Sequence, residues 1–202
     1  VGTPLEGTVL KFAEDGEILT KGPHVMLGYY KNPEATKEVI DSEGFMHTGD
    51  IGHLVDGKYL KITDRKKEIF KLSLGKYVAP QAIENLLKES PYIQNCIVIG
   101  ENQKFASAII VPDFERLHFW AAKHGINYTD NKELITNPKI LAKIHRIVEE
   151  VNGKTSPHEN IKREKIVCDE WTTANNMLSQ TLKLKRAKIM SKYAGLVNEI
   201  YK

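Results

Sequence analysis

The stretch IGHLVDGKYLKI, residues Ile51–Ile62, decides how the first part of this chain folds. Two β-prone runs flank Asp56-Gly57, the two-residue loop that suits a type I′ turn because both of its residues adopt positive φ angles. The stretch therefore predicts a β-hairpin. The densest run of charges in the chain, DRKKE at residues 64–68, follows almost directly, and we expect a boundary between two domains there.

On either side of this hairpin, further patterns predict a mixture of strands and helices. Asn-Pro pairs and an Asp in front of helix-periodic runs are typical of helix starts, because their side chains accept hydrogen bonds from the first free amides. The expected strands lie at 8–12, 17–20, 93–100, 105–111 and 165–167, and the expected helices at 33–40, 80–90, 113–123, 138–151 and from about 186. The predicted fold class is α+β, with a short β-rich segment over 1–63 and a small mixed domain over 64–202.

The composition is that of an ordinary globular chain of 202 residues, 41% of them hydrophobic. The 29 Lys and Arg residues are nearly balanced by 26 Asp and Glu, which argues against a polyanion binder. Cys96 and Cys168 form no CxxC motif, and no His cluster stands at metal-ligand spacing, so neither a disulfide framework nor a zinc site is suggested. No 20-residue apolar span is present, so we expect a cytoplasmic protein without a transmembrane segment. Because strand-like sequence begins almost at once after Val1, we expect the chain to be part of a longer protein.

Four segments carry polar and charged residues in a fixed order along the chain. Taken singly, each has an ordinary structural interpretation: a strand with a capped helix, an Asp closing a turn, a solvated linker, and an exposed strand or loop. The segments are GPHVMLGYYKNPEAT at 22–36, HTGD at 47–50, DRKKEIFKLSLGKYVAP at 64–80 and LSQTLKLKR at 178–186.

Together and in this order, the four segments resemble the adenylate-forming superfamily of acyl-CoA synthetases, adenylation domains and firefly luciferase. The resemblance is closest to the long-chain fatty acid CoA ligases. It implies that residues 1–63 are the trailing β-rich part of a large N-terminal domain, and that 64–202 form a small mobile C-terminal domain with a hinge at its start. The Ser/Thr/Gly-rich loop that holds the ATP phosphates in this family has no counterpart here, so we expect a fragment that is inactive alone.

The resemblance implies a reaction in two steps. A fatty acid and ATP give an acyl-adenylate and diphosphate, and the acyl group then passes to the thiol of coenzyme A with release of AMP. The implied cofactors are ATP or AMP, CoA and Mg²⁺, the last held mainly by the missing part of the N-terminal domain. The implied partners are the fatty acid, ATP, CoA and that missing part, and no nucleic acid is expected. Peripheral membrane association of the longer protein stays open.

Residue by residue, the resemblance implies the following roles. Asp50 binds the two ribose hydroxyls of the nucleotide, and Arg65 approaches the ribose and phosphate. Lys183 is the catalytic lysine of the first step, where its ammonium neutralises charge as diphosphate leaves. The family has Gly just before this lysine where the present chain has Leu182, so Lys185 is the second choice.

Two further positions belong to the change between the two steps. Lys67 matches the hinge about which the small domain swings. Gly75 lies in the loop on the CoA side, where a residue without Cβ lets the pantetheine arm approach.

Two other hypotheses stay open on the sequence. One is a related ligase that loads the acyl group onto a carrier protein instead of CoA. The other is a non-enzymatic basic binding module, which rests on the clusters at 65–67 and 183–186. The acyl chain length, the thiol acceptor and the oligomeric state cannot be read from these motifs.

Overall fold

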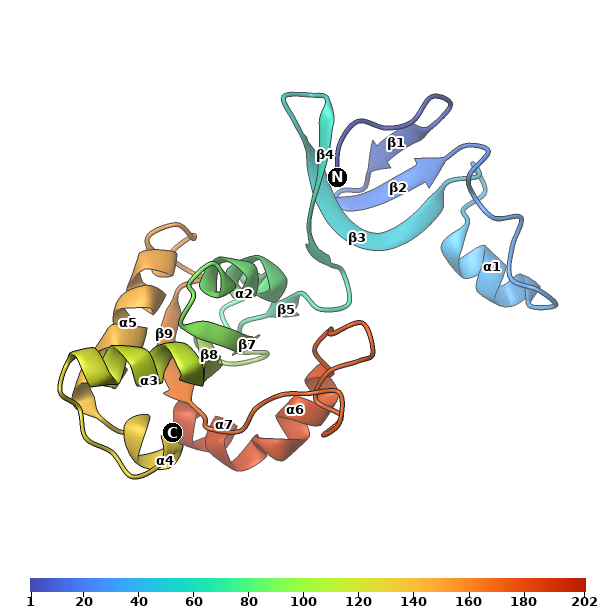
Figure 1. The fold of residues 1–202 in the computed structure, drawn as a ribbon. Helices are drawn as coiled ribbons and strands as arrows, with labels where there is room; N and C mark the ends of the chain where they lie inside the picture. The colour runs from blue at the N-terminus through green and yellow to red at the C-terminus, as the bar shows by residue number, and fades with distance from the viewer. The chain divides into compact units, whose positions relative to one another are not determined.

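The computed structural model describes all residues, 1–202, and divides the chain into two compact units, Val1–Ile69 and Phe70–Lys202 (Figure 1). The division falls just after the charged run 64–68, six residues later than the boundary expected after 63. It lies later because Asp64 and Arg65 continue the last strand of the smaller unit, and a turn over 66–68 follows them.

The smaller unit is a four-stranded antiparallel sheet with one short helix. The strand order is β1-β2-β3-β4, so each strand pairs with its neighbour in sequence. The elements are β1 (Val9–Phe12), β2 (Glu17–Lys21), α1 (Pro33–Val39), β3 (Met46–Val55) and β4 (Tyr59–Arg65). The predicted hairpin is confirmed as β3 and β4. Three residues, Asp56, Gly57 and Lys58, lie between the strands, one more than expected, and the first two have φ angles of 52° and 65°.

The larger unit is built on a three-stranded sheet that helices cover on both faces (Figure 1). The strand order is β7-β8-β9; β7 and β8 are antiparallel, and β8 and β9 are parallel. The elements are β5 (Phe70–Lys71), β6 (Tyr77–Val78), α2 (Pro80–Lys88), β7 (Ile93–Ile99), β8 (Ala106–Pro112), α3 (Phe114–Lys123), α4 (Asn131–Leu134), α5 (Pro138–Asn152), β9 (Ile161–Ile166), α6 (Arg186–Lys192) and α7 (Ala194–Tyr201).

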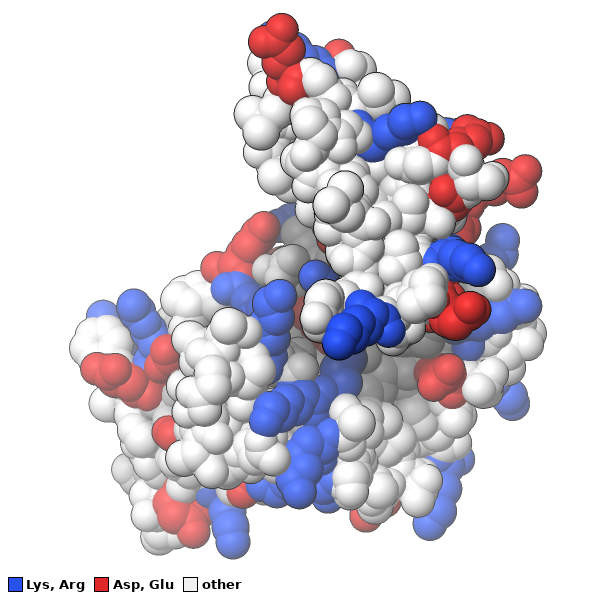
Figure 2. Space-filling view, turned by 90° about the vertical axis from the view of Figure 1, so that its right-hand side faces the viewer, with Lys and Arg blue, Asp and Glu red and all other residues white.

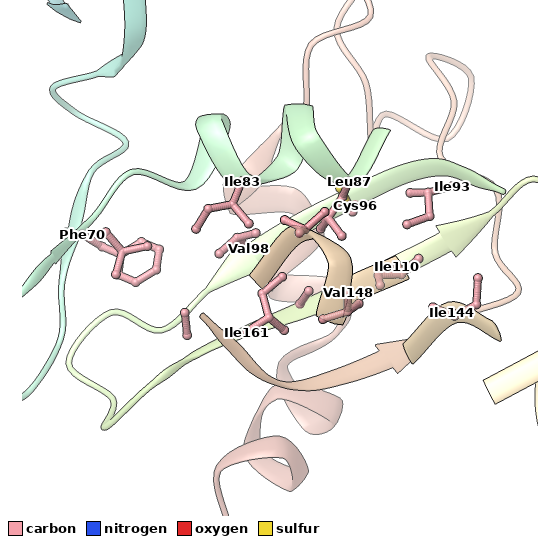
Figure 3. Close-up of a cluster of buried hydrophobic side chains, with 14 of the residues drawn as sticks. Phe70, Ile83, Leu87, Ile93, Cys96, Val98, Ile110, Ile144, Val148 and Ile161 are labelled. Carbon is pink, nitrogen blue, oxygen red and sulfur yellow. The ribbon is translucent and has the colours of Figure 1, made fainter. Parts of the chain in front are cut away.

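The apolar runs of β7 and β8 are continuous because each face of the sheet has its own core. Cys96 and Val98 point to the face covered by α2 and α5, where Figure 3 shows them among the buried side chains of both helices. Ile97 and Ile99 point to the opposite face, where they pack with residues of the segment after β9 and of α6 and α7. The sheet therefore links the helices on its two sides into one folded unit.

The predicted helix starts are confirmed by their caps. The Asn32 side chain accepts a hydrogen bond from the Ala35 amide at 3.1 Å, and the Asp113 side chain from the Arg116 amide at 2.9 Å. Asn137 does the same for the amide of Lys139. Each cap satisfies an amide that has no partner inside its own helix.

The structure differs from the sequence-based expectation in several elements. The short strands β5 and β6 were not expected, and β3 begins at Met46, earlier than the predicted strand. The short helix α4 was not expected, and β9 begins at Ile161, earlier than the predicted strand. The single final helix is interrupted at Tyr193, which ends α6 and precedes α7. Tyr193 lies 8% exposed, and its hydroxyl donates to Asp169 and accepts from the Trp171 indole, so tertiary contacts fix this residue at the break.

Candidate functional site

Asp50 and Arg65 lie directly opposite each other on β3 and β4. The Arg65 Nε is 3.2 Å from Asp50 Oδ1, and the two side chains are 55% and 23% exposed. Fifteen positions apart in sequence, the two residues expected to contact a nucleotide are thus brought into one ion pair. An ionised carboxylate can accept several hydrogen bonds, so Asp50 keeps the capacity to bind the vicinal hydroxyls of a ribose. The pair therefore keeps both acceptor and donor atoms available to a ligand.

Residues 48–50 form part of strand β3, whereas the sequence suggests a tight turn before the hairpin. The strand is distorted here because Gly49 has a φ of +70°, in the left-handed region that favours glycine. The Thr48 hydroxyl holds the distorted strand by donating to the Ile18 carbonyl at 2.7 Å and accepting from the Asp50 amide at 3.1 Å. The position of Asp50 is thus set by its neighbours on the strand.

The buried carboxylate of Glu17, on β2, also binds the segment around Gly49. Its side chain accepts hydrogen bonds from the Gly49 amide at 3.0 Å, from Lys66 Nζ at 2.9 Å and from the ring of His47 at 3.1 Å. Burial raises the pKa of Glu17, but the hydrogen bonds from Lys66, His47 and Gly49 outweigh it and hold this pKa below its usual value. Glu17 therefore stays ionised and ties Gly49 to Lys66.

Glu17 was not singled out from the sequence, and Lys66 was named only as part of the basic cluster at 65–67. Lys66 also forms an ion pair with Asp15 at 2.7 Å, and its hydrogen bonds to Asp15 and Glu17 raise the pKa of its ammonium group. One signal was available: Glu17 opens the run EILT, a charged residue directly before three strand residues that are buried in the fold. Charged residues are rarely buried without a partner.

Lys67 lies exposed in the turn that follows β4. The amides of Glu68 and Ile69 both donate to the Arg65 carbonyl, at 2.9 and 3.2 Å. The residue expected to act as a hinge thus lies within three positions of the division between the two units.

In the larger unit, Met177–Lys185 form a small hairpin, which we call the lysine hairpin. Its arms are joined by a bridge between Leu178 and Leu184 and by a hydrogen bond from the Ser179 amide to the Lys183 carbonyl at 2.8 Å. Met177 and Leu178 are buried with the core around α6, whereas Lys183 is exposed. Figure 2 views the molecule from the side on which α6 lies and shows Lys and Arg side chains gathered on this part of the larger unit.

Leu182 has a φ of +58° and is 71% exposed. This left-handed conformation normally favours glycine, the residue that the family has at the position before its lysine. In this chain the residue in the left-handed conformation, Leu182, lies directly before Lys183. The residue before Lys185 is Leu184, which does not have a positive φ. Lys185 instead forms the N-cap of α6, and its ammonium group donates to the Asn176 side chain.

Gly75 lies in the exposed loop between β5 and β6, with a φ of +84°. Its amide donates to the Leu72 carbonyl at 2.9 Å, which closes the turn. A Cβ added here would meet only the side chain of Lys71, at 3.8 Å, so the loop is open on this side.

No group of three or more His, Cys, Asp or Glu side chains could hold a metal ion. None of the helices has the length and apolar character needed to cross a membrane.

Residues 67–202 match the family described as the AMP-binding enzyme C-terminal domain. The chain belongs to this family. Membership confirms the resemblance that the four sequence segments indicated, and the mixed α+β fold agrees with it.

Relatives of the family extend the similarity to the whole chain. The chain is 39% identical over 202 residues to "Putative fatty-acid--CoA ligase fadD11" of Mycobacterium tuberculosis, covering 100% of this chain and 35% of that protein. It is 37% identical over 215 residues to long-chain-fatty-acid–CoA ligase 6 of Homo sapiens, covering 100% of this chain and 31% of that protein. The chain thus spans about a third of the length of these relatives.

Among solved structures, the fold is similar to the A-PCP didomain of carboxylic acid reductase from Segniliparus rugosus in complex with AMP. The TM-score is 0.73 at 26% identity, over 99% of this chain and 28% of that one. The adenylation domain of a carboxylate reductase from Mycobacterium chelonae shares the fold with a TM-score of 0.76 at 24% identity, over 98% of this chain and 31% of that one.

Proposed function

We propose that this chain is the C-terminal part of an ATP-dependent fatty acid CoA ligase, and that it is inactive without the rest of its N-terminal domain. The complete protein would convert a fatty acid, ATP and CoA to acyl-CoA, AMP and diphosphate through an acyl-adenylate. The observation that carries the proposal is the similarity along the whole chain to relatives named as fatty acid CoA ligases. A cytoplasmic location is part of the same proposal.

In the nucleotide site, Asp50 would accept hydrogen bonds from both ribose hydroxyls. The ion pair with Arg65 supports this role because it fixes the direction of the carboxylate, while the exposed guanidinium keeps N–H groups for the ribose or the phosphate. Glu17 and Thr48 would hold the strand that presents Asp50.

In the first step, a carboxylate oxygen of the fatty acid attacks the α-phosphorus of ATP. A new P–O bond forms, and the bond from the α-phosphorus to the bridging oxygen breaks as diphosphate leaves with the electron pair. The Lys183 ammonium would stabilise the negative charge that gathers on these oxygens. Removing such a group costs on the order of 10²- to 10³-fold in rate.

In the second step, the thiolate of CoA attacks the acyl carbon and the bond to AMP breaks. Lys183 has no role in this step, so we propose that the larger unit swings about Lys67 between the steps. Gly75, in an open loop at positive φ, would then face the pantetheine arm.

The test compares Lys183→Ala with Lys185→Ala in the full-length protein. Fatty-acid-dependent diphosphate release reports the first step, and thioester formation from supplied acyl-adenylate reports the second. We expect Lys183→Ala to slow the first step by roughly 10²- to 10³-fold and to leave the second nearly unchanged. Loss of the first step in Lys185→Ala with full activity in Lys183→Ala would show that the catalytic lysine is misassigned.

The same assay separates the alternatives. Thioester formed only on a phosphopantetheinylated carrier protein, and not on CoA, would indicate the carrier-protein-loading ligase. If neither lysine affects either step, the basic-module hypothesis predicts binding to an anionic polymer with a steep dependence on salt.

A further inference from the structure

Glu84, on α2, is a buried carboxylate that none of the steps above uses. It is 3% exposed and shares its helix with the buried side chains of Ile83 and Leu87. Figure 3 shows these two neighbours directed at β7, next to Cys96 and Val98. Burying a carboxylate is costly unless strong partners compensate for the lost water. The partners of Glu84 therefore indicate what the residue does.

Two groups bond to the same carboxylate oxygen. Glu84 Oε1 accepts from the Val98 amide at 2.7 Å and from Arg186 Nη2 at 2.6 Å. Arg186 Nη1 in turn donates to the Val98 carbonyl at 3.3 Å. β7 is an edge strand of its sheet, so Glu84 and Arg186 together satisfy main-chain groups of Val98 that no further strand pairs.

Arg186 is the residue that directly follows the lysine hairpin. The ion pair joins positions 102 apart in sequence, and it ties the end of the hairpin to both α2 and β7. The hairpin has other supports as well: the bridge and main-chain hydrogen bonds between its arms, side-chain hydrogen bonds of Ser179 and Lys185, and the burial of Met177 and Leu178. The Arg186 pair adds a charged link to α2. Three residues span at most about 10 Å, so the place of Arg186 limits where the Lys183 backbone can lie.

We propose that Glu84 is a positioning residue for Lys183, acting through Arg186. The carboxylate fixes the guanidinium on the edge of β7, the guanidinium fixes the end of the hairpin, and the hairpin sets the reach of the Lys183 ammonium. The inference rests on the proposed role of Lys183 in the first step. A misplacement of about 1 Å at a reacting group can cost 10²-fold in rate. Loss of an anchor three residues from Lys183 should therefore change the rate of the first step measurably.

The experiment uses the full-length protein with Glu84→Gln and Arg186→Lys. Gln keeps an acceptor for the Val98 amide but removes the charge, and Lys keeps the charge but removes the planar fork. Glu89→Gln is the matched control, because Glu89 directly follows α2 and its side chain is 64% exposed. Two rates are measured: single-turnover diphosphate release at saturating ATP, and thioester formation from supplied acyl-adenylate.

We expect both test variants to slow the first step by about 10- to 100-fold and the second by less than about twofold, with the control unchanged. Amide hydrogen exchange supplies a readout that does not depend on activity. The amides of Ser179, Leu182 and Lys185 should exchange faster in the test variants, while those in the centre of β8 keep their protection.

Two results would overturn the proposal. One is a first step as fast as in the wild-type protein in both variants. The other is an equal loss in both steps with faster exchange throughout the larger unit, which would show that Glu84 only stabilises the fold. Failure of the proposed function looks different: Lys183→Ala would then leave the first step intact, while the hairpin amides of Glu84→Gln would still exchange faster.

Discussion

Replacing Glu84 with Gln should change how the stability of the larger unit depends on pH. Burial raises the pKa of Glu84 from its ordinary value of 4.5 to about 7, although Arg186 and the Val98 amide oppose this effect. Between these two values the native protein keeps a proton that the unfolded chain has lost. The contribution of Glu84 to the free energy of unfolding therefore falls as the pH rises from 4.5 to 7, by roughly 3 kcal/mol at 1.36 kcal/mol per pH unit.

The chain offers a selective probe for this measurement. Both of its tryptophans, Trp120 and Trp171, lie in the larger unit, so their fluorescence during urea unfolding reports that unit alone. Between pH 5 and pH 8, the free energy of unfolding of the wild type and of Glu89→Gln should fall by about 2 to 3 kcal/mol more than that of Glu84→Gln. A difference between wild type and Glu84→Gln that stays constant over this range would refute the reasoning, because Glu84 would then titrate alike in both states.

Substitutions at three more positions test other parts of the structure. Gly52→Ala should destabilise the smaller unit by about 2 kcal/mol, seen as faster amide exchange in β3 and β4, because its Cβ would lie 2.4 Å from the Lys61 carbonyl oxygen. Leu182→Gly should relieve about 1 kcal/mol of left-handed strain and increase protection of the Ser179 amide, whereas Leu182→Val should decrease it. Asp50→Asn in the full-length protein should raise the Kd for AMP by about tenfold or more in calorimetry, and an unchanged Kd would remove Asp50 from the nucleotide site.

Local chemistry was enough to predict much of the fold. The Asp56-Gly57 loop fixed one hairpin, and the side chains of Asn32, Asp113 and Asn137 marked three helix starts. Each of these signals acts on residues only a few positions away in the sequence, so it can be recognised without knowing the fold. The order of the four motifs likewise indicated the family, because it requires only the sequence and no knowledge of distances.

Features that depend on distant partners could not be predicted. Glu84 and Arg186 are separated by 102 positions, and Glu17 and Lys66 by 49, so no local pattern connects them. The break at Tyr193 has the same cause, because it coincides with bonds to the segment before the lysine hairpin. The sequence indicated Asp50 and Arg65 only as two separate residues. The antiparallel register of β3 and β4 places them opposite each other.

The anchoring of Lys66 bears on the proposed hinge at Lys67. Its amide donates to the Gly49 carbonyl and its ammonium group is bonded to Asp15 and Glu17, so the main chain is fastened up to this residue. Beyond it, the turn is closed by the two amide bonds to the Arg65 carbonyl. Opening these two bonds by themselves costs about 1 to 3 kcal/mol. A swivel at this connection would thus start at Lys67 and leave the nucleotide residues on the preceding strands undisturbed.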